Sequence, residues 1–316
     1  MKKDQNTILP LARRRKPWLS LLDLMILPGL LYLIINNYLP MIGLVIAFKK
    51  VVFGKGILGI LGSPWVGMKN FIYLFTTQDA WIITRNTILY NLVFIVLLNV
   101  VGISVGIMLS ELRRRQMAKF YQTTILLPQL ISILIISNIV FAFLSTEYGF
   151  VNKTILPALG IPEVNFYSDK TLWPYILTFV YIWKGIGYAA VIYYAAVIGI
   201  DRELFEAALV DGANKRQQIF KITMPLLRPT VITLVLINVG RIFYSDFGLF
   251  YQVPMNSGAL FNVTNTIDTY VYRALLQLND ISRASAAGFY QSIVGFVVVL
   301  IANAAVHKLD PDSALF

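Results

Sequence analysis

The sequence predicts an all-α integral membrane protein with six transmembrane helices. Of its 316 residues, 57% are hydrophobic and 14% are charged, and the mean hydropathy is +0.69. A soluble domain of this size would be less apolar and richer in charge. The apolar residues also gather into runs of about 20 residues or more, the length that crosses a bilayer. Basic residues flank these runs, as they do in membrane proteins.

Six runs reach spanning length. They lie at Leu19–Phe48, Asn86–Leu109, Gln122–Phe143, Leu172–Gly199, Leu226–Phe247 and Ala284–Val306. Pro28, Gly29 and Pro40 interrupt the first and longest run, so we expect it to kink or to continue as a short external helix. It is too long for the apolar core of a signal peptide and is interpreted as a retained span.

The domain organisation follows from these runs. A basic tail, 1–18, precedes a single transmembrane domain, 19–306, and a short tail, 307–316, follows it. Lys and Arg are concentrated in the N-terminal tail and in the loops after the second and fourth runs, which predicts cytoplasmic N- and C-termini. These residues are Lys2, Lys3, Arg13–Lys16, Arg113, Arg114, Arg115, Lys119, Arg202, Lys215, Arg216, Lys221 and Arg228. The net charge of +11 therefore indicates membrane orientation, and no nucleic-acid partner is expected.

Several kinds of chemistry are excluded by composition. The chain has no cysteine, which removes disulfides, thiolate catalysis and Cys-ligated metals. Its one histidine, His307, cannot form a His-based triad or a multi-His metal site. The Gly-x-x-x-x-Gly-Lys-Ser/Thr phosphate loop is missing, so the sequence predicts no ATP-hydrolysing site of this type in the chain. We expect no catalytic residue, no metal and no cofactor bound by this chain.

The polar loop of residues 200–228, between the fourth and fifth runs, predicts a helix–turn–helix. A first helix, Arg202–Asp211, would end at Gly212, which can adopt a left-handed conformation. Its apolar stripe would be Leu204, Phe205, Ala208 and Leu209.

A second short amphipathic helix is expected over Ala213–Ile222. Pro225 and Pro229 would stop it and start the next span. Such a segment fits either a groove in a soluble partner or an interfacial helix without a partner, and physics alone leaves both open.

This loop resembles the EAA loop of binding-protein-dependent ABC transporter permeases. That pattern is Glu-Ala-Ala, three residues, Gly, nine residues, Ile, one residue and Leu-Pro. The matching residues are Glu206, Ala207, Ala208, Gly212, Ile222 and Pro225, with Met224 in the place of Leu. Further segments resemble the carbohydrate-uptake branch of LplB-like and MalF-like sugar permeases, so nearly the whole chain is covered. They are Pro40–Phe48, Trp65–Phe71, Asn86-Thr87 and Leu127-Pro128.

The resemblance implies a type I ABC importer permease fold with a cytoplasmic coupling-helix loop, in a bacterial cytoplasmic membrane. It implies a second homologous permease subunit, two ATPase subunits that hold ATP and Mg, and an extracellular solute-binding lipoprotein that delivers a saccharide. The ATPase-coupling residues it implies are Glu206, Ala207, Ala208, Asp211, Gly212, Ile222 and Pro225.

Ionisable residues inside spans usually face a cavity or a partner. Lys184, Arg241 and Asp246 are such residues, and their segments bracket the polar loop. Sugars are bound by aromatic stacking and by hydrogen-bonding side chains. These segments supply both kinds of side chain, so we predict that they line the substrate path. Its residues are Trp183, Lys184, Tyr188, Asn238, Arg241, Tyr244 and Asp246.

The role of the charges on this path has two interpretations. Lys184 and Arg241 could pair with Asp246 inside the bundle or extend to the membrane surface. If they are unpaired, two cations on the path fit an acidic saccharide.

Other hypotheses stay open. An ABC permease for a non-sugar solute would carry the same loop. A secondary transporter would need ion-coupling carboxylates in its spans, where Asp246 and Asp23 are the candidates. The spacing of Gly102 and Gly106 predicts close helix packing in lipid. Aromatic residues in the outer loops fit a belt at the lipid headgroups or a surface for an external partner; they include Trp65, Phe71, Trp81, Tyr148, Phe150, Phe166 and Trp173.

Overall fold

A computed structural model describes residues 21–51, 59–60 and 62–309 of the chain. Every regular element in these ranges is a helix, and one isolated antiparallel bridge joins Lys49 to Trp65. The predicted all-α class is therefore confirmed. The chain forms two compact units, Met1–Val45 and Ile46–Phe316.

The first apolar run is helical from Leu24 to Phe48. Its side chains from Leu24 to Ile42 are exposed. The expected kink takes the form of changes in helix type. The successive elements are α1 (Leu21–Leu33), the π-helical turn η1 (Ile34–Tyr38), α2 (Leu39–Met41) and the 3-10 helix η2 (Ile42–Phe48).

Three prolines are each preceded by a π-helical turn. The turns η1, η4 (Val151–Ile155) and η5 (Ile219–Thr223) end two residues before Pro40, Pro157 and Pro225. A proline ring inside a helix clashes with the carbonyl four residues earlier. The wider π turn accommodates the ring without ending the helix.

The centre of the second unit is the pair α5 (Gln78–Ser110) and α9 (Trp173–Ile198), which make the most extensive helix contact in the described chain. A Cβ added at Gly102 would lie 2.9 Å from the Ala189 side chain, and one at Gly106 would lie 2.8 Å from Tyr193. The predicted close packing through these two glycines is confirmed.

The third apolar run differs from its prediction as one span over Gln122–Phe143. It consists of α6 (Arg115–Leu130) and α7 (Ile133–Leu144), which meet at 91°. Ile131 has an extended ψ of 131°, and Ser132 caps α7 by accepting a hydrogen bond from a backbone N–H. Five helices are long and apolar enough to span a membrane, or six if this bent pair is one span.

The fifth predicted run, Leu226–Phe247, is also only partly helical. Helix α12 (Met224–Val239) ends at Gly240, so the last residues of that run are not part of it. The chain then forms short helices before the last span. These are α13 (Phe247–Gln252), η6 (Gly258–Leu260), α14 (Phe261–Thr264), α15 (Ile267–Leu276) and finally α16 (Ile281–Leu309).

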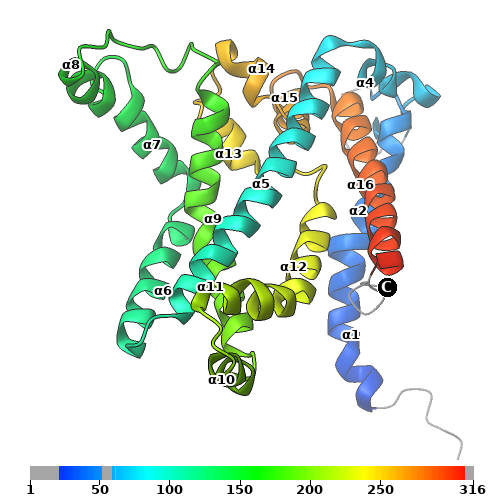
Figure 1. Ribbon diagram of the computed structural model, residues 1–316. Coiled ribbons are helices and arrows are strands. Elements are labelled where there is room, and N and C mark those ends of the chain that lie inside the picture. Colours follow the sequence, from blue (N-terminus) through cyan, green and yellow to red (C-terminus); the bar gives the residue numbers. More distant parts are fainter. Residues whose placement is uncertain (1–20, 52–58, 61, 310–316) are drawn as a thin grey trace, which may run out of the picture. The chain divides into compact units, whose positions relative to one another are not determined.

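The second unit has two distinct ends (Figure 1). One end carries α10 (Arg202–Val210), α11 (Lys215–Gln218) and the turn between α5 and α6. The opposite end carries α14, α15, α4 (Tyr73–Thr76), η3 (Gly67–Phe71) and α8 (Leu156–Ala158). The two basic loops predicted to share one side of the membrane, around Arg113–Arg115 and Lys215, thus lie at the same end.

Candidate functional site

The loop between α9 and α12 is a helix–turn–helix, as predicted. Asp201 caps α10, because its carboxylate accepts a hydrogen bond of 3.0 Å from the N–H two residues on. Gly212 ends α10 with a φ of +78°. Its N–H donates to the carbonyl of Leu209 at 3.0 Å, and the N–H of Ala213 donates to that of Ala208 at 2.8 Å. These two bonds form a Schellman motif, which needs a residue without a Cβ at Gly212.

The second helix of the loop starts from a capping box. Asn214 accepts a hydrogen bond of 2.9 Å from the N–H of Gln217, whose side chain accepts one of 2.8 Å in return. The prediction that Pro225 and Pro229 stop this helix is wrong. The helical path is continuous over Lys215–Val239, since the π turn η5 accommodates Pro225. The Gly212 turn therefore joins the span through a continuous helix.

Helix α10 exposes three large apolar side chains. Val210 is 88% exposed, Leu209 61% and Leu204 46%. Of the predicted apolar stripe, Phe205 and Ala208 are half-buried, whereas Leu204 and Leu209 are exposed. Glu206, Ala207 and Asp211 are exposed as well. An apolar surface beside charged groups on a short helix is typical of a docking element.

Four of the predicted coupling residues meet at one hollow of about 360 Å³. Ala208, Asp211, Gly212 and Ile222 line it. Gln218 also lines this hollow; its buried side chain donates a 3.2 Å hydrogen bond to the carbonyl of Ala213. Pro225 lies outside the hollow and is exposed.

An ion pair ties this loop to the neighbouring turn. Lys215 Nζ lies 2.8 Å from a carboxylate oxygen of Glu111, which follows the last residue of α5. Sequence reasoning missed this contact, because 104 residues separate its partners. Both side chains are largely exposed, so the pair contributes little stability.

Helix α9 carries three of the predicted path residues. Trp183 packs against the central apolar cluster, Lys184 is partly exposed and Tyr188 is 64% exposed. Close packing fixes this part of α9. A Cβ added at Gly187 would lie 2.1 Å from the carbonyl oxygen of Ile125 on α6, so only glycine lets the two helices approach.

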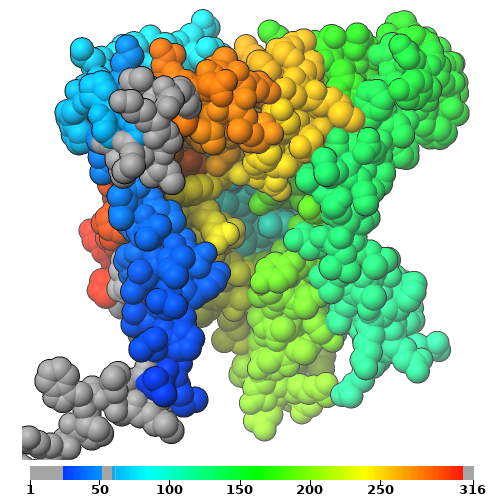
Figure 2. All heavy atoms as spheres, turned by 180° about the vertical axis from the view of Figure 1, so that it is seen from behind, coloured from blue at the N-terminus to red at the C-terminus, as the bar shows by residue number. Residues whose placement is uncertain are grey.

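The other four predicted path residues lie at the end of α12 and in the non-helical segment after it. Arg241 donates its N–H to the carbonyl of Asn238 at 3.0 Å, and Tyr244 donates its N–H to that of Arg241 at 2.8 Å. These tight turns put Arg241 and Tyr244 on the surface, and the Tyr244 hydroxyl lies 3.2 Å from Ser292 Oγ on α16. In Figure 2, yellow atoms of this part of the chain border a hollow with teal α5 on its floor.

The expected alternative of an internal ion pair is not found in the described part of the chain. Asp246 is the N-cap of α13, and its carboxylate accepts a 3.0 Å hydrogen bond from the N–H of Leu249. The described ion pairs include neither Lys184 nor Arg241. Asp246 therefore caps α13, and neither Lys184 nor Arg241 has a carboxylate within ion-pair distance in the described part of the chain.

Three polar side chains near the path were missed. Asn91, Asp268 and Gln291 hydrogen-bond to the segment that contains Arg241 and Tyr244. Asn91 and Gln291 lie inside predicted spans. A polar amide within an apolar span is therefore the sequence signal that indicates them. Asp268 lies between spans, and no sequence signal indicated its contacts.

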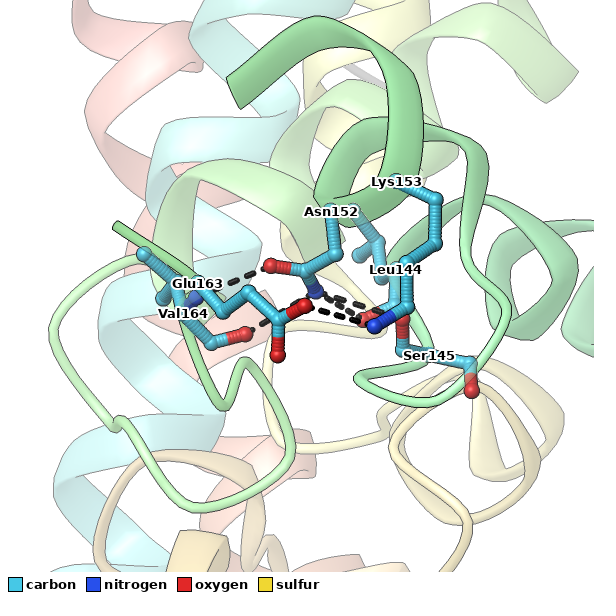
Figure 3. A network of polar contacts seen from close by, with 6 residues as sticks. All are labelled: Leu144, Ser145, Asn152, Lys153, Glu163 and Val164. Atoms are coloured by element: carbon cyan, nitrogen blue, oxygen red, sulfur yellow. Dashed lines mark hydrogen bonds and ion pairs between the residues drawn. The ribbon is translucent and has the colours of Figure 1, made fainter. Parts of the chain in front are cut away.

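At the opposite end, a buried asparagine organises the loop between α7 and α9 (Figure 3). Asn152 Nδ2 donates to the carbonyls of Leu144, Ser145 and Val164 at 3.3, 3.2 and 3.0 Å, and its Oδ1 accepts from the N–H of Val164 at 2.8 Å. Lys153 pairs with Glu163 at 2.6 Å.

The aromatic residues predicted to form a belt fall into two groups by exposure. Tyr148, Phe150, Trp65 and Trp81 are exposed. Phe71, Phe166 and Trp173 are buried, and the Trp173 indole donates a 2.6 Å hydrogen bond to the carbonyl of Phe166. The buried residues belong to the core, contrary to both interpretations offered for them.

Comparison with known proteins defines the class. The chain belongs to the family of binding-protein-dependent transport system inner membrane components, whose model matches residues 99–312. Members are ABC transporter permeases, so the chain is a multi-pass membrane protein with the type I permease fold and is a transport subunit rather than an enzyme.

Particular relatives are similar over almost their whole length. The chain is 33% identical over 296 residues to the polygalacturonan/rhamnogalacturonan transport system permease protein YteP of Bacillus subtilis (strain 168), covering 92% of this chain and 89% of that one. It is 32% identical over 302 residues to Protein LplB of the same organism, covering 95% and 92%. A crystal structure of a bacterial ABC transporter involved in the import of the acidic polysaccharide alginate matches with a TM-score of 0.83 and 31% identity, covering 92% and 96%.

Proposed function

We propose that this chain is the permease subunit of an ATP-driven importer for an acidic oligosaccharide or polysaccharide fragment. A separate ATPase subunit would dock on α10, and an extracellular solute-binding protein would deliver the saccharide. The observation that carries this proposal is the set of exposed apolar side chains on α10, a short helix joined to a span through a glycine turn and a continuous helix.

Coupling would proceed through rigid connections. α10 would sit in a groove of the ATPase subunit, where Leu209 and Val210 lose contact with water and Glu206 forms polar contacts. Because Lys215–Val239 is a continuous helical path, motion of the docked loop would move α12 as a lever. The chain segment after α12 holds Arg241 and Tyr244, so ATP-driven motion would reach the candidate path.

The acidic nature of the substrate is inferred from charge. Lys184 and Arg241 lack a carboxylate partner in the described chain, and cations inside a membrane protein are costly unless they serve a ligand or partner. Two of the similar proteins point the same way. One is named for polygalacturonan and rhamnogalacturonan transport, and the other imports alginate, an acidic polysaccharide.

The proposed assembly contains two permease subunits, of which this is one, and two ATPase subunits that hold ATP and Mg. We also infer that the termini are cytoplasmic in a bacterial plasma membrane. The placement of the basic loops at the α10 end supports this orientation. A solved alginate transporter in complex with an alginate pentasaccharide-bound periplasmic protein supports the delivery step, with a TM-score of 0.82 and 31% identity.

The docking assignment is tested by Glu206→Arg in the purified complex. We expect the ATPase subunit to co-purify poorly and the stimulation of ATP hydrolysis by the binding protein to be lost. Glu147→Arg, an exposed residue at the opposite end, is the matched control for docking and should leave co-purification of the ATPase subunit intact. If Glu206→Arg retains docking and stimulated hydrolysis, α10 is not the coupling element.

A further inference from the structure

The segment Gly240–Asp246 interrupts the helical path between α12 and α13 inside an apolar run of the chain. Non-helical backbone at membrane depth needs partners for its peptide groups, since lipid offers none. Discontinuous helices in transporters tend to lie where a binding cavity is lined. The partners of this segment therefore bear on what the segment does.

Side chains from three distant helices supply these partners. Asn91 Nδ2 on α5 donates to the carbonyls of Ile242 and Tyr244 at 3.0 and 2.9 Å. Gln291 Nε2 on α16 donates to the carbonyl of Phe243, which lies between them. Three consecutive carbonyls thus accept hydrogen bonds from amide side chains.

The N–H of Ser245, which belongs to the same peptide group as the Tyr244 carbonyl, donates to a carboxylate. Asp268 on α15 accepts hydrogen bonds of 2.6 and 2.8 Å from the N–H and Oγ of Ser245. Gln291 also donates to Asp268, at 3.2 Å to each oxygen, so these two side chains are linked directly, while Asn91 holds the same segment from α5. We call Asn91, Asp268 and Gln291 the polar clamp.

The clamp determines which side chains of the segment point outward. Phe243 is 5% exposed and packs in an apolar cluster with Ile83 and Ile267. Its neighbours Arg241 and Tyr244 are exposed, and Tyr244 is 43% exposed. Gln291, at 4% exposure, fixes the backbone from the buried side. The clamp therefore holds the backbone so that a cation and a phenol face away from the core.

We propose that the polar clamp is a positioning device that sets where Arg241 and Tyr244 meet the saccharide, and thereby sets selectivity. This inference rests on the proposed function, because it takes these two residues to line the path. Asn91, Asp268 and Gln291 act on the substrate through the backbone of the segment and do not touch it. Loosening the clamp should then change substrate affinity without removing the ATPase subunit.

Positioning can be measured without any substrate. The chain has no cysteine, so Tyr244→Cys introduces a single thiol whose rate of modification by a charged methanethiosulfonate reagent reports its placement. Adding Asn91→Leu should change this rate several-fold. Asn138→Leu is the matched control, because Asn138 Nδ2 bonds only the carbonyl of Leu134 within its own helix. An unchanged rate with Asn91→Leu would overturn the proposal whatever the permease transports.

Selectivity is then measured in the reconstituted complex with its binding protein. Oligogalacturonides and neutral galacto-oligosaccharides of equal length are the probes. We expect Asn91→Leu and Asp268→Leu to raise the KM for oligogalacturonide uptake about tenfold with a smaller change in kcat, and Asp268→Asn to restore part of the loss because it keeps an acceptor for Ser245.

A combined variant separates positioning from a general structural role. Asn91→Leu added to the pair Arg241→Ala and Tyr244→Ala should cause no further loss, because the clamp acts on the saccharide only through these two side chains. Additive losses, or a fall in kcat with KM unchanged, would overturn the clamp. Failure of the unmodified complex to import either saccharide would instead contradict the proposed function and leave the labelling result standing.

Discussion

The loop between α9 and α12, which connects two spans, and the segment Gly240–Asp246, which follows α12, are held in opposite ways. The loop is stabilised by residues within a few positions of one another: Asp201, Gly212 and Asn214 with Gln217. The segment is held by Asn91, Asp268 and Gln291, which are distant in sequence. A locally stabilised loop can keep its shape while it docks on a partner. A segment held from three helices moves only when those helices move.

This difference predicts that removing a clamp residue costs more than changing any one cap in the loop. Gln291→Leu leaves the carbonyl of Phe243 without its donor in apolar surroundings, which should destabilise the fold by about 1–3 kcal/mol. The melting temperature of the detergent-solubilised protein measures this loss. Gln277→Leu, at an exposed site, should have the same melting temperature as the native protein. An equal fall in melting temperature for both variants would contradict the greater cost predicted for a clamp residue.

In the loop, the largest effect is expected at Gly212. Gly212→Ala places a Cβ at a φ of +78°, which costs about 1–2 kcal/mol, and should weaken ATPase docking several-fold while oligogalacturonide KM stays unchanged. Gly258→Ala is the control, since an added Cβ also meets open space there without a left-handed φ. Equal docking in both variants would show that the turn is not needed in this shape.

A smaller loss is expected from the capping box. Asn214→Ala removes the acceptor for the N–H of Gln217, worth about 1 kcal/mol of helix stability. We expect faster hydrogen exchange confined to the first turn of the helix that starts at Lys215. Faster exchange around Tyr244 as well would mean that the two regions are not held independently.

The smallest effect is expected at the ion pair between Glu111 and Lys215. Both partners are largely exposed, so Glu111→Gln should change stability by about 0–1 kcal/mol, less at high salt. Comparing melting temperatures at low and high ionic strength checks this. A large, salt-independent loss would show that the pair has a structural role that its exposure does not suggest.

The same contrast explains what the sequence could predict. Helix α10 and its end at Gly212 follow from local signals, as does the packing at Gly102 and Gly106. Hydropathy, however, measures the length of an apolar run and not the continuity of its backbone. It therefore missed the 91° bend after Leu130 and the end of α12 at Val239.

Other features of the structure could not be predicted from the signals used for the helices. The continuous helix through Pro225 depends on the π turn η5, whereas proline at this position predicts the end of a helix. Asp246 was predicted on the substrate path by its charge, and its carboxylate also accepts a hydrogen bond from the N–H of Leu249 and caps α13, a role that the sequence prediction did not include. The clamp joins four segments that only the fold brings together.

The central claim is that an uncompensated cation at the break after α12 meets an acidic saccharide. The most direct measurement is uptake of an oligogalacturonide and of a neutral galacto-oligosaccharide of equal length by the reconstituted complex carrying Arg241→Glu. Lys170→Glu, an exposed cation between α8 and α9, is the control. We predict that uptake of the oligogalacturonide falls by about tenfold or more, the equivalent of roughly 1.4 kcal/mol, while that of the neutral saccharide falls much less. Equal losses for the two saccharides would contradict the claim.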